Sequence, residues 1–484
     1  MGIVRKQSFS NMLITYTGFV FGAVNTLFLY TNLMSDEHYG LINFILSAAM
    51  VLMPLMAFGV HNAMVKFYNR FVGTPDENAF LTLMLLLPLG LIIPLTLWVH
   101  ITYDAIAQFL SRQNEIVGNY VWHIVLVGVA MAYFEIFYAW ARVHLKSVFG
   151  NFMKELFCRV GVAILLVLLY FKIIDVPAFI NLLVGIYLLR TIVMKLYAYA
   201  IKRPVLTFAF PGNSKEIFTY SALLIIGGSV ATILLEIDKV MINNFIPLEN
   251  VAFYSVASFM AIAIAVPARA MHQITYPLTA KLLTQGTGQE LKVLYQKSSL
   301  TLFIASGILF LLILLNLHDI YLLIPETYSA GFTIVFWIGL AKVYDSLLGN
   351  NNSILYNSKY YKTVLLFGVF LAMLTIALNL WLIPKFGLKG AAIASFMAFA
   401  IYNSMKLWYV HKKFHIHPFT KETFKVLSLL ALVAILFFPL QFPFHPLVNI
   451  VLKGLLMAAM YLGLLYRFKI SEDVMGLLSK FLKR

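Results

Sequence analysis

Apolar residues recur along this chain in runs that are long enough to cross a lipid bilayer. A helix needs about 20 mostly apolar residues to span the hydrocarbon core, because each residue advances it by about 1.5 Å. We count about fourteen such runs, at residues 9–30, 40–62, 79–100, 119–140, 151–171, 177–200, 217–238, 250–273, 293–317, 329–352, 362–383, 389–410, 424–441 and 447–467. These runs are too long for barrel strands, so the sequence predicts an all-α, polytopic membrane protein with about fourteen transmembrane helices.

The composition excludes a water-soluble fold. Hydrophobic residues make up 61% of the chain and charged residues only 12%, whereas soluble proteins carry about 25% charged residues. The single cysteine, Cys158, excludes an internal disulfide. The formal net charge of +16 comes mainly from short loops between the apolar runs. That placement argues against nucleic acid as a partner and favours an anionic lipid surface or an anionic, lipid-borne substrate.

Basic residues concentrate in alternate loops, which is the pattern that sets membrane orientation. If the N-terminus is cytoplasmic, the loops on that side hold Arg5, Lys6, Lys66, Arg70, Arg142, Lys146, Lys202, Arg203, Lys215, Lys281, Lys292, Lys359, Lys362, Lys412, Lys413, Lys421, Lys480, Lys483 and Arg484. The opposite loops hold mainly acidic residues, namely Asp36, Glu37, Asp104, Glu115, Asp175, Glu249, Asp319 and Glu326. We therefore predict that both termini are cytoplasmic.

The two halves of the chain share a pattern. After the first run the chain reads NLMSDEHYGLINFILSAA, and after the seventh it reads NFIPLENVAFYSVASFMA, so that Glu37 aligns with Glu249. A proline follows at nearly the same depth in each helix, at Pro54 and Pro267. Both copies begin with a helix that crosses from inside to outside, so the repeat is parallel. A parallel repeat implies two similar bundles around a central cavity.

The repeat divides the chain into three predicted parts. An N-terminal lobe at 1–203 contains helices 1–6, and a C-terminal lobe at 204–413 contains helices 7–12. Residues 414–484 contain two appended helices and a cytoplasmic tail, which have no counterpart in the repeat. The polar segment at 202–216, KRPVLTFAFPGNSKE, is predicted to connect the two lobes on the cytoplasmic side.

Three kinds of segment resemble one family of membrane transporters. The first is the pair of acidic turns described above, and the second is LEIDKVMI at 235–242. The third is NLWLIPKFGLKGAAIAS at 379–395, where Pro384, Gly387 and Gly390 precede the next helix. Together these segments resemble the polysaccharide-export branch of the multidrug/oligosaccharidyl-lipid/polysaccharide exporter superfamily, the Wzx-type flippases. The resemblance covers essentially the whole chain.

The resemblance implies a flippase and not an enzyme. Its members are implied to move undecaprenyl-pyrophosphate-linked oligosaccharide from the cytoplasmic to the outer leaflet of a bacterial inner membrane, for surface polysaccharide biosynthesis, by alternating access. The expected partners are the lipid-linked oligosaccharide and membrane lipids, with a polysaccharide polymerase and glycosyltransferases as candidate protein partners. Neither a metal nor a cofactor is expected, apart from a coupling H⁺ or Na⁺.

Several charged residues are predicted to lie within the membrane, where charge is costly and therefore indicates function. They are Glu135, Arg190, Asp238, Arg269, Lys342 and Asp345. Glu135 and Asp345 lie equally far into the fourth and tenth helices, so each lobe is predicted to present one acid.

These charges suit an anionic lipid-linked cargo and a coupling ion. Arg269, Lys342 and Arg190 are the candidate ligands for the pyrophosphate. Arg269 is favoured because no acidic residue lies within four positions on its own helix, and because a guanidinium presents a planar fork of donors to phosphate. Glu135, Asp238 and Asp345 are the candidate sites for a coupling proton or sodium ion.

A purely structural alternative stays open for the same charges. Salt bridges within the membrane could join Lys342 to Asp345, Glu236 to Lys239 and Glu135 to Arg190. Asp238 points about 200° away from Glu236 around their helix. His61 and His272 lie near inner helix ends and are interpreted as packing or interface residues.

Three other functions fit the sequence less well. A lipid II flippase of the same superfamily is expected to carry arginines in its first helix, and residues 9–30 contain no charge. A cation-coupled multidrug exporter is expected to have more acids and fewer cations at membrane depth. A membrane enzyme needs a sizeable polar loop for its chemistry, and the longest loops here are short.

Overall fold

The computed structural model describes residues 2–471, without the side chains of residues 2–6, 8, 9 and 226–235. Every regular element within this part of the chain is helical. Ten segments of the described residues are long and apolar enough to cross a membrane. The protein therefore has the predicted all-helical, polytopic membrane fold. The end of the predicted cytoplasmic tail, at 472–484, lies outside the described residues.

The chain forms two compact units, Met1–Ala252 and Phe253–Arg484. The helices of the first unit are α1 (Gly2–Val24), α2 (Tyr30–Leu33), α3 (Asp36–Met56), α4 (Val60–Phe71), α5 (Glu77–Leu86), α6 (Leu89–Ile101), α7 (Tyr103–Leu110), α8 (Val121–Val143), α9 (Ser147–Phe152), α10 (Cys158–Tyr170), α11 (Val176–Ile201) and α12 (Ser214–Phe245). Two π-helical segments, η1 (Asn25–Leu29) and η3 (Met153–Phe157), continue α1 and α9, and the 3₁₀ segment η2 (Glu115–Tyr120) leads into α8.

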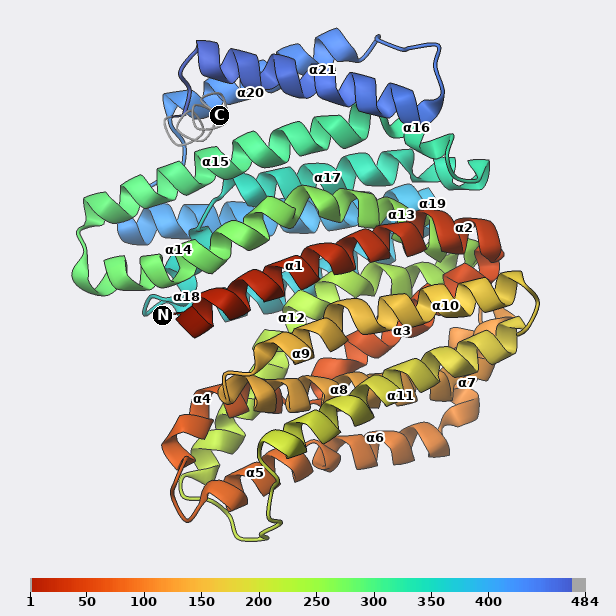
Figure 1. Cartoon of the computed structure of the whole chain (residues 1–484), viewed down its shortest axis with the longest axis vertical. Coiled ribbons are helices and arrows are strands. Elements are labelled where there is room, and N and C mark those ends of the chain that lie inside the picture. The colour runs from red at the N-terminus through yellow and green to blue at the C-terminus, as the bar shows by residue number, and fades with distance from the viewer. Residues whose placement is uncertain (1, 472–484) are drawn as a thin grey trace. The chain divides into compact units, whose positions relative to one another are not determined.

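Helix α8 is the packing centre of the first unit. It contacts α3, α4 and α11, and α8 and α11 run side by side (Figure 1). Trp140 and Phe134 of α8 are among the largest fully buried side chains of the chain. Gly128 brings α8 close to α3, because a Cβ atom there would lie 2.9 Å from Met56 Sδ. Small residues of this kind allow helices to pack closely in a membrane, where lipid supplies no hydrophobic drive for helix association.

Local sequence signals explain where several helices begin and end. Ser35 caps α3 by accepting a hydrogen bond from the His38 backbone, and Asp175 caps α11 in the same way. Gly59 precedes α4 with φ 64°, and a Cβ atom there would lie 2.6 Å from the Ser221 carbonyl of α12. Glycine is therefore required at that bend both for its backbone angle and for the close approach of α12.

The helices of the second unit are α13 (Glu249–Ile262, which begins in the first unit), α14 (Val266–Gln285), α15 (Gly288–Leu315), α16 (Leu317–Tyr321), α17 (Phe332–Leu347), α18 (Asn351–Tyr356), α19 (Tyr361–Phe414), α20 (Lys421–Phe437) and α21 (Pro446–Arg467). The 3₁₀ segments are η4 (Ala263–Ala265) and η5 (Glu326–Gly331). Helix α19 contains two of the predicted runs, and it is interrupted at Gly387, where φ is 56° and ψ is −135°. Only glycine adopts that backbone conformation readily.

The appended helices α20 and α21 pack on α15 and α16 (Figure 1). Gly307 of α15 leaves room for Leu430 of α20, since a Cβ atom at Gly307 would overlap the Leu430 side chain. Lys453 of α21 donates a 2.8 Å hydrogen bond to the Leu315 carbonyl, at the end of α15. The predicted tail helices are therefore an integral part of the second unit.

The units divide further along the chain than the predicted lobes do. The predicted lobe boundary lies between residues 203 and 204, whereas α12 belongs to the first unit. Helix α12 packs along α3 and α4, and Gly40 of α3 makes room for the backbone of Leu248 beyond α12. That the two predicted lobes move as separate bodies during transport stays a prediction.

Candidate functional site

Glu135 of α8 forms an ion pair with Lys154 in the first unit. Lys154 Nζ lies 2.6 Å from Glu135 Oε1. Lys154 belongs to η3, the π-helical turn between α9 and α10, and such turns often occur at functional sites. The Lys154 side chain is 42% exposed and that of Glu135 is 15% exposed. The cation is therefore the accessible member of this pair.

Further cations surround the same carboxylate. Arg142 Cζ lies 4.8 Å from the centroid of the Tyr138 ring, and Lys154 Nζ lies 5.9 Å from it. Arg142 and His61 of α4 lie within electrostatic range of Glu135. We call Glu135, Lys154, Arg142, Tyr138 and His61 the Glu135 cluster. Its lysine and arginine outnumber its one acid, so the cluster carries an excess of positive charge.

Arg190 of α11 is buried among aromatic rings. Its Cζ atom lies 4.0 Å from the Phe134 ring centroid and 4.9 Å from that of Tyr187, and the residue is 7% exposed. Its Nε atom has no hydrogen-bond partner among the described residues. The alternative pairing of Glu135 with Arg190 is wrong, because Lys154 occupies the position next to the carboxylate. The Arg190 guanidinium therefore contacts aromatic rings and not a carboxylate.

Asp345 of α17 pairs with Lys406 of α19 in the second unit. Lys406 Nζ lies 3.7 Å from Asp345 Oδ1 and donates a 2.9 Å hydrogen bond to Asn352 Oδ1. The Lys406 side chain is 1% exposed and that of Asp345 is 42% exposed. His272 of α14 lies within electrostatic range of both charges. We call Asp345, Lys406, Asn352 and His272 the Asp345 cluster.

Lys342 and Arg269 are the predicted cargo ligands of the second unit. Lys342 Nζ lies 4.8 Å from the Phe399 ring centroid. Arg269 is exposed on α14, and no hydrogen bond or ion pair to it occurs among the residues that the structure describes. Arg269 is therefore a cation that stays available to a ligand of this unit.

The charges of α12 divide into a pair and a buried acid. Lys239 Nζ lies 2.5 Å from Glu236 Oε2, which also accepts a 2.8 Å hydrogen bond from Ser47 of α3. This confirms the predicted salt bridge within the helix. Asp238 is buried at 4% exposure and interacts with surrounding residues. Asp238 is therefore the least accessible of the predicted coupling acids.

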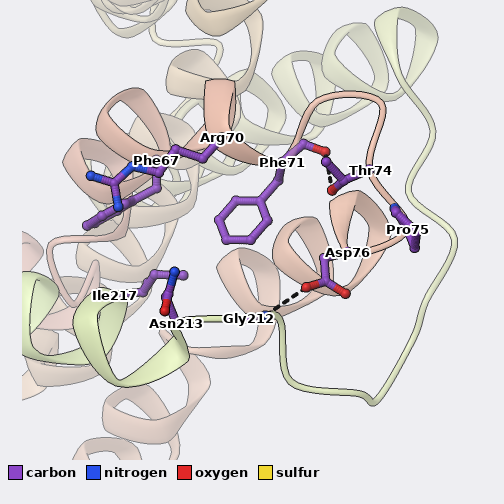
Figure 2. A pocket seen from close by; sticks show the side chains of 9 residues that line it. All are labelled: Phe67, Arg70, Phe71, Thr74, Pro75, Asp76, Gly212, Asn213 and Ile217. Atoms are coloured by element: carbon purple, nitrogen blue, oxygen red, sulfur yellow. Dashed lines mark hydrogen bonds between the residues drawn. The ribbon is translucent and has the colours of Figure 1, made fainter.

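A separate pocket of about 440 Å³ lies where the 202–213 connector meets the first unit (Figure 2). Arg70 pairs with Glu216 at 3.0 Å, and Asp76 Oδ2 accepts a 2.8 Å hydrogen bond from the Gly212 backbone. Lys202 also pairs with Glu77, at 3.3 Å. These contacts attach the connector and the start of α12 to α4, to α5 and to the loop between them, so the pocket has a structural explanation.

Sequence reasoning found the two acids and missed the two lysines. Lys154 lies at the start of a predicted apolar run, and Lys406 lies near the inner end of another. Depth alone could have marked Lys406, since a lysine inside a predicted span is costly. No group of His, Cys, Asp and Glu suitable for a metal ion occurs among the described residues.

Comparisons with known proteins agree with this description. The family model described as "Polysaccharide biosynthesis protein" matches residues 4–283, which is more than half of the chain. An uncharacterized membrane protein of Methanocaldococcus jannaschii is 23% identical over 321 residues, which cover 62% of this chain. The aligned part spans 61% of that relative's length.

Two solved structures share the fold. The lipid II flippase MurJ in an inward closed conformation matches with a TM-score of 0.70 at 13% sequence identity. The match covers 95% of this chain and 99% of the MurJ chain. An inward-facing multidrug resistance MATE family transporter of the MOP superfamily has a TM-score of 0.64 at 12% identity, and covers 84% of this chain and 98% of its own. The two matched structures are a flippase and a transporter, and this chain has the fold that they share.

Proposed function

Because this chain belongs to the polysaccharide biosynthesis protein family, we propose that it is a flippase for an undecaprenyl-pyrophosphate-linked oligosaccharide. It carries this cargo from the cytoplasmic to the outer leaflet for surface polysaccharide biosynthesis. The family match over residues 4–283 is the observation that carries the proposal. A bacterial inner membrane is part of the proposal, and the archaeal relative is the reason to test other membranes too.

The proposed topology has fourteen transmembrane helices and two cytoplasmic termini. Ten segments qualify by length and hydropathy. Helix α19 counts twice because it breaks at Gly387. The unbroken stretch of α9, η3 and α10, the long helix α12, and α20 supply the others. In this topology the first twelve form the two lobes, and the last two are the appended pair.

The proposed cargo site consists of cations. Arg269 is exposed and has no acidic partner in the described part of the chain, so it can offer its whole donor fork to a pyrophosphate. Lys342 is the second candidate ligand. Arg190 is covered by Phe134 and Tyr187, so we propose a lesser role for it in positioning these rings. The lobes expose the cargo to each side of the membrane in turn.

The proposed coupling site is Asp345. It is the most accessible carboxylate of the predicted set, and its lysine partner is 3.7 Å away. Glu135 is held more tightly by Lys154 and is mostly covered. Either a proton or a sodium ion satisfies a carboxylate in this position, and binding it competes with Lys406.

Cargo movement in reconstituted liposomes tests the function. Purified protein is offered a fluorescent undecaprenyl-pyrophosphate oligosaccharide, and wild type is compared with Arg269→Ala. We expect protein-dependent flipping that falls at least ten-fold in the variant. Arg112→Ala is the matched control, because Arg112 is also exposed and lies in a loop outside the predicted spans.

Each other outcome has a defined meaning. Flipping that survives in Arg269→Ala keeps the function and discards the site. Movement of lipid II but not of the oligosaccharide lipid identifies a lipid II flippase. Export of a cationic dye under an ion gradient, with no movement of either lipid, identifies a multidrug exporter.

A further inference from the structure

A groove of about 410 Å³ runs along one side of the first unit, between α5, α6, α8 and α11. It begins at a break between α5 and α6, because Pro88 has no backbone N–H group to continue the helix. The Tyr133 hydroxyl of α8 donates a 3.1 Å hydrogen bond to the Leu85 carbonyl next to this break. This hydrogen bond joins α8 to α5 at that end of the groove.

Aliphatic side chains form the walls of the groove together with three aromatic rings of α8 and α11. Leu86, Leu188 and Ile192 line it, and each of them is exposed. Their helices α5 and α11 belong to segments that qualify as membrane spans. An exposed aliphatic groove on a spanning segment suits a hydrocarbon chain, which gains close packing there without unpaired polar groups.

Lys195 of α11 is the one charged residue that lines the groove. It is exposed, and its Nζ atom lies 5.5 Å from the Tyr199 ring centroid. No acidic residue pairs with it among the described residues. A lysine at this depth without an acidic partner favours a negatively charged group beside the groove.

The place of Lys195 along α11 indicates where that negative group lies. Lys195 is six residues before the end of the helix at Ile201, or about 9 Å at 1.5 Å per residue. In the predicted orientation this end faces the cytoplasm. The lysine stem carries its ammonium group part of that distance, since Nζ lies near the ring of Tyr199 one turn further along the helix. The ammonium group thus approaches the level of the phosphates of the inner leaflet.

We propose that this groove binds one hydrocarbon chain of an anionic membrane phospholipid, and that Lys195 pairs with the phosphate of the same lipid. A single cation matches a phosphate of one negative charge, whereas a pyrophosphate calls for several donors and charges. The lipid is therefore distinct from the transported cargo, and the proposal does not rest on the flippase function.

Native mass spectrometry of the full-length protein tests the site. Protein in detergent is mixed with equal amounts of phosphatidylglycerol and phosphatidylcholine, and the bound lipids are counted. We expect wild type to retain phosphatidylglycerol preferentially. Lys195→Ala is expected to weaken that binding about five-fold, since one basic residue near the membrane surface contributes about 1 kcal/mol to the attraction of anionic lipid.

A second variant and a control make the test specific. Ile192→Trp fills the groove without changing the charge, and it is expected to reduce retention of both lipids. Lys215→Ala removes an exposed lysine of the same unit outside the groove, and it is expected to bind as wild type does. Equal retention of the two lipids by wild type, or unchanged binding by Lys195→Ala or Ile192→Trp, overturns the proposal.

Discussion

The Glu135 cluster and the Asp345 cluster each contain a carboxylate–lysine pair, and the exposure of the two members is opposite in the two clusters. In the first unit the lysine is 42% exposed and the acid is 15% exposed. In the second unit the lysine is 1% exposed and the acid is 42% exposed. A histidine from an earlier helix accompanies each pair, His61 and His272. A ligand thus meets a cation at the Glu135–Lys154 pair and an anion at the Asp345–Lys406 pair.

This difference indicates a division of roles. At the first pair an accessible lysine beside Arg142 is suited to attract phosphate groups, in addition to the proposed cargo ligands Arg269 and Lys342 of the second unit. At the second pair an accessible carboxylate is suited to a proton or a sodium ion. The tighter pair, at 2.6 Å, lies in the first unit, and the looser pair, at 3.7 Å, lies in the second. The looser pair is the one that a coupling ion can separate at lower cost.

The largest expected effect is on stability, in Asp345→Asn. The substitution leaves Lys406 buried with Asn352 as its remaining polar partner, and an unpaired buried charge typically costs about 3 kcal/mol or more. Unfolding of the detergent-solubilised protein by denaturant measures the loss. Asp345→Asn/Lys406→Met removes both charges and is expected to recover most of it. A single variant as stable as wild type contradicts the burial of Lys406.

The first unit is expected to give the reverse order with smaller values. Lys154→Ala leaves the covered carboxylate of Glu135 with Arg142 and His61, and we expect a loss of about 1 kcal/mol. Glu135→Gln leaves an exposed lysine, whose ion pairs contribute little, and the expected loss is smaller still. The same unfolding measurement compares the two variants. A greater loss in Glu135→Gln than in Lys154→Ala removes the contrast between the clusters.

The cargo side of the contrast predicts a moderate kinetic effect. Lys154→Ala is expected to raise the KM for the oligosaccharide lipid about five-fold with kcat little changed, because one cation near the membrane surface attracts anionic lipid with about 1 kcal/mol. Initial flipping rates at several cargo densities in liposomes provide both constants. Lys146→Ala, at a nearby exposed lysine, is the control. An unchanged KM in Lys154→Ala would show that Lys154 does not contribute to cargo binding.

The smallest expected effect concerns the two histidines. His272→Ala is expected to change the pH profile of flipping, because His272 lies near the accessible acid. His61→Ala is expected to leave that profile as it is, because Glu135 is already held by Lys154. Flipping rates from pH 5.5 to 8.5 measure both profiles. If only His61→Ala changes the pH profile, the proton-sensitive group lies in the first unit, and the prediction is wrong.

The sequence was sufficient to predict an all-helical membrane fold, and it indicated two acids that each pair with a lysine in the structure. Hydropathy depends on composition alone, so apolar runs predict membrane helices without any knowledge of their packing. Glu135 and Asp345 were found because a carboxylate inside an apolar run is rare and costly. Their matching positions followed from the internal repeat.

The partners of these acids could not be predicted in the same way. Lys154 is 19 residues from Glu135, and Lys406 is further along the chain from Asp345 on another helix. Such pairs depend on how neighbouring helices are rotated, and the i, i+3 rule reaches only partners on one helix, such as Glu236 and Lys239. Arg190 was predicted as a ligand from its depth in the membrane. Its contacts with the rings of Phe134 and Tyr187 depend on helix packing and cannot be predicted from residue spacing.

The most direct test compares gradient-driven flipping in two matched double variants. Glu135→Gln/Lys154→Met and Asp345→Asn/Lys406→Met each remove both members of one carboxylate–lysine pair. Flipping of the oligosaccharide lipid is measured with and without a proton or sodium gradient. We predict that the second-unit variant loses its response to the gradient, while the first-unit variant keeps it and binds cargo more weakly. Loss of the response in the first-unit variant alone would contradict the assignment of coupling to Asp345.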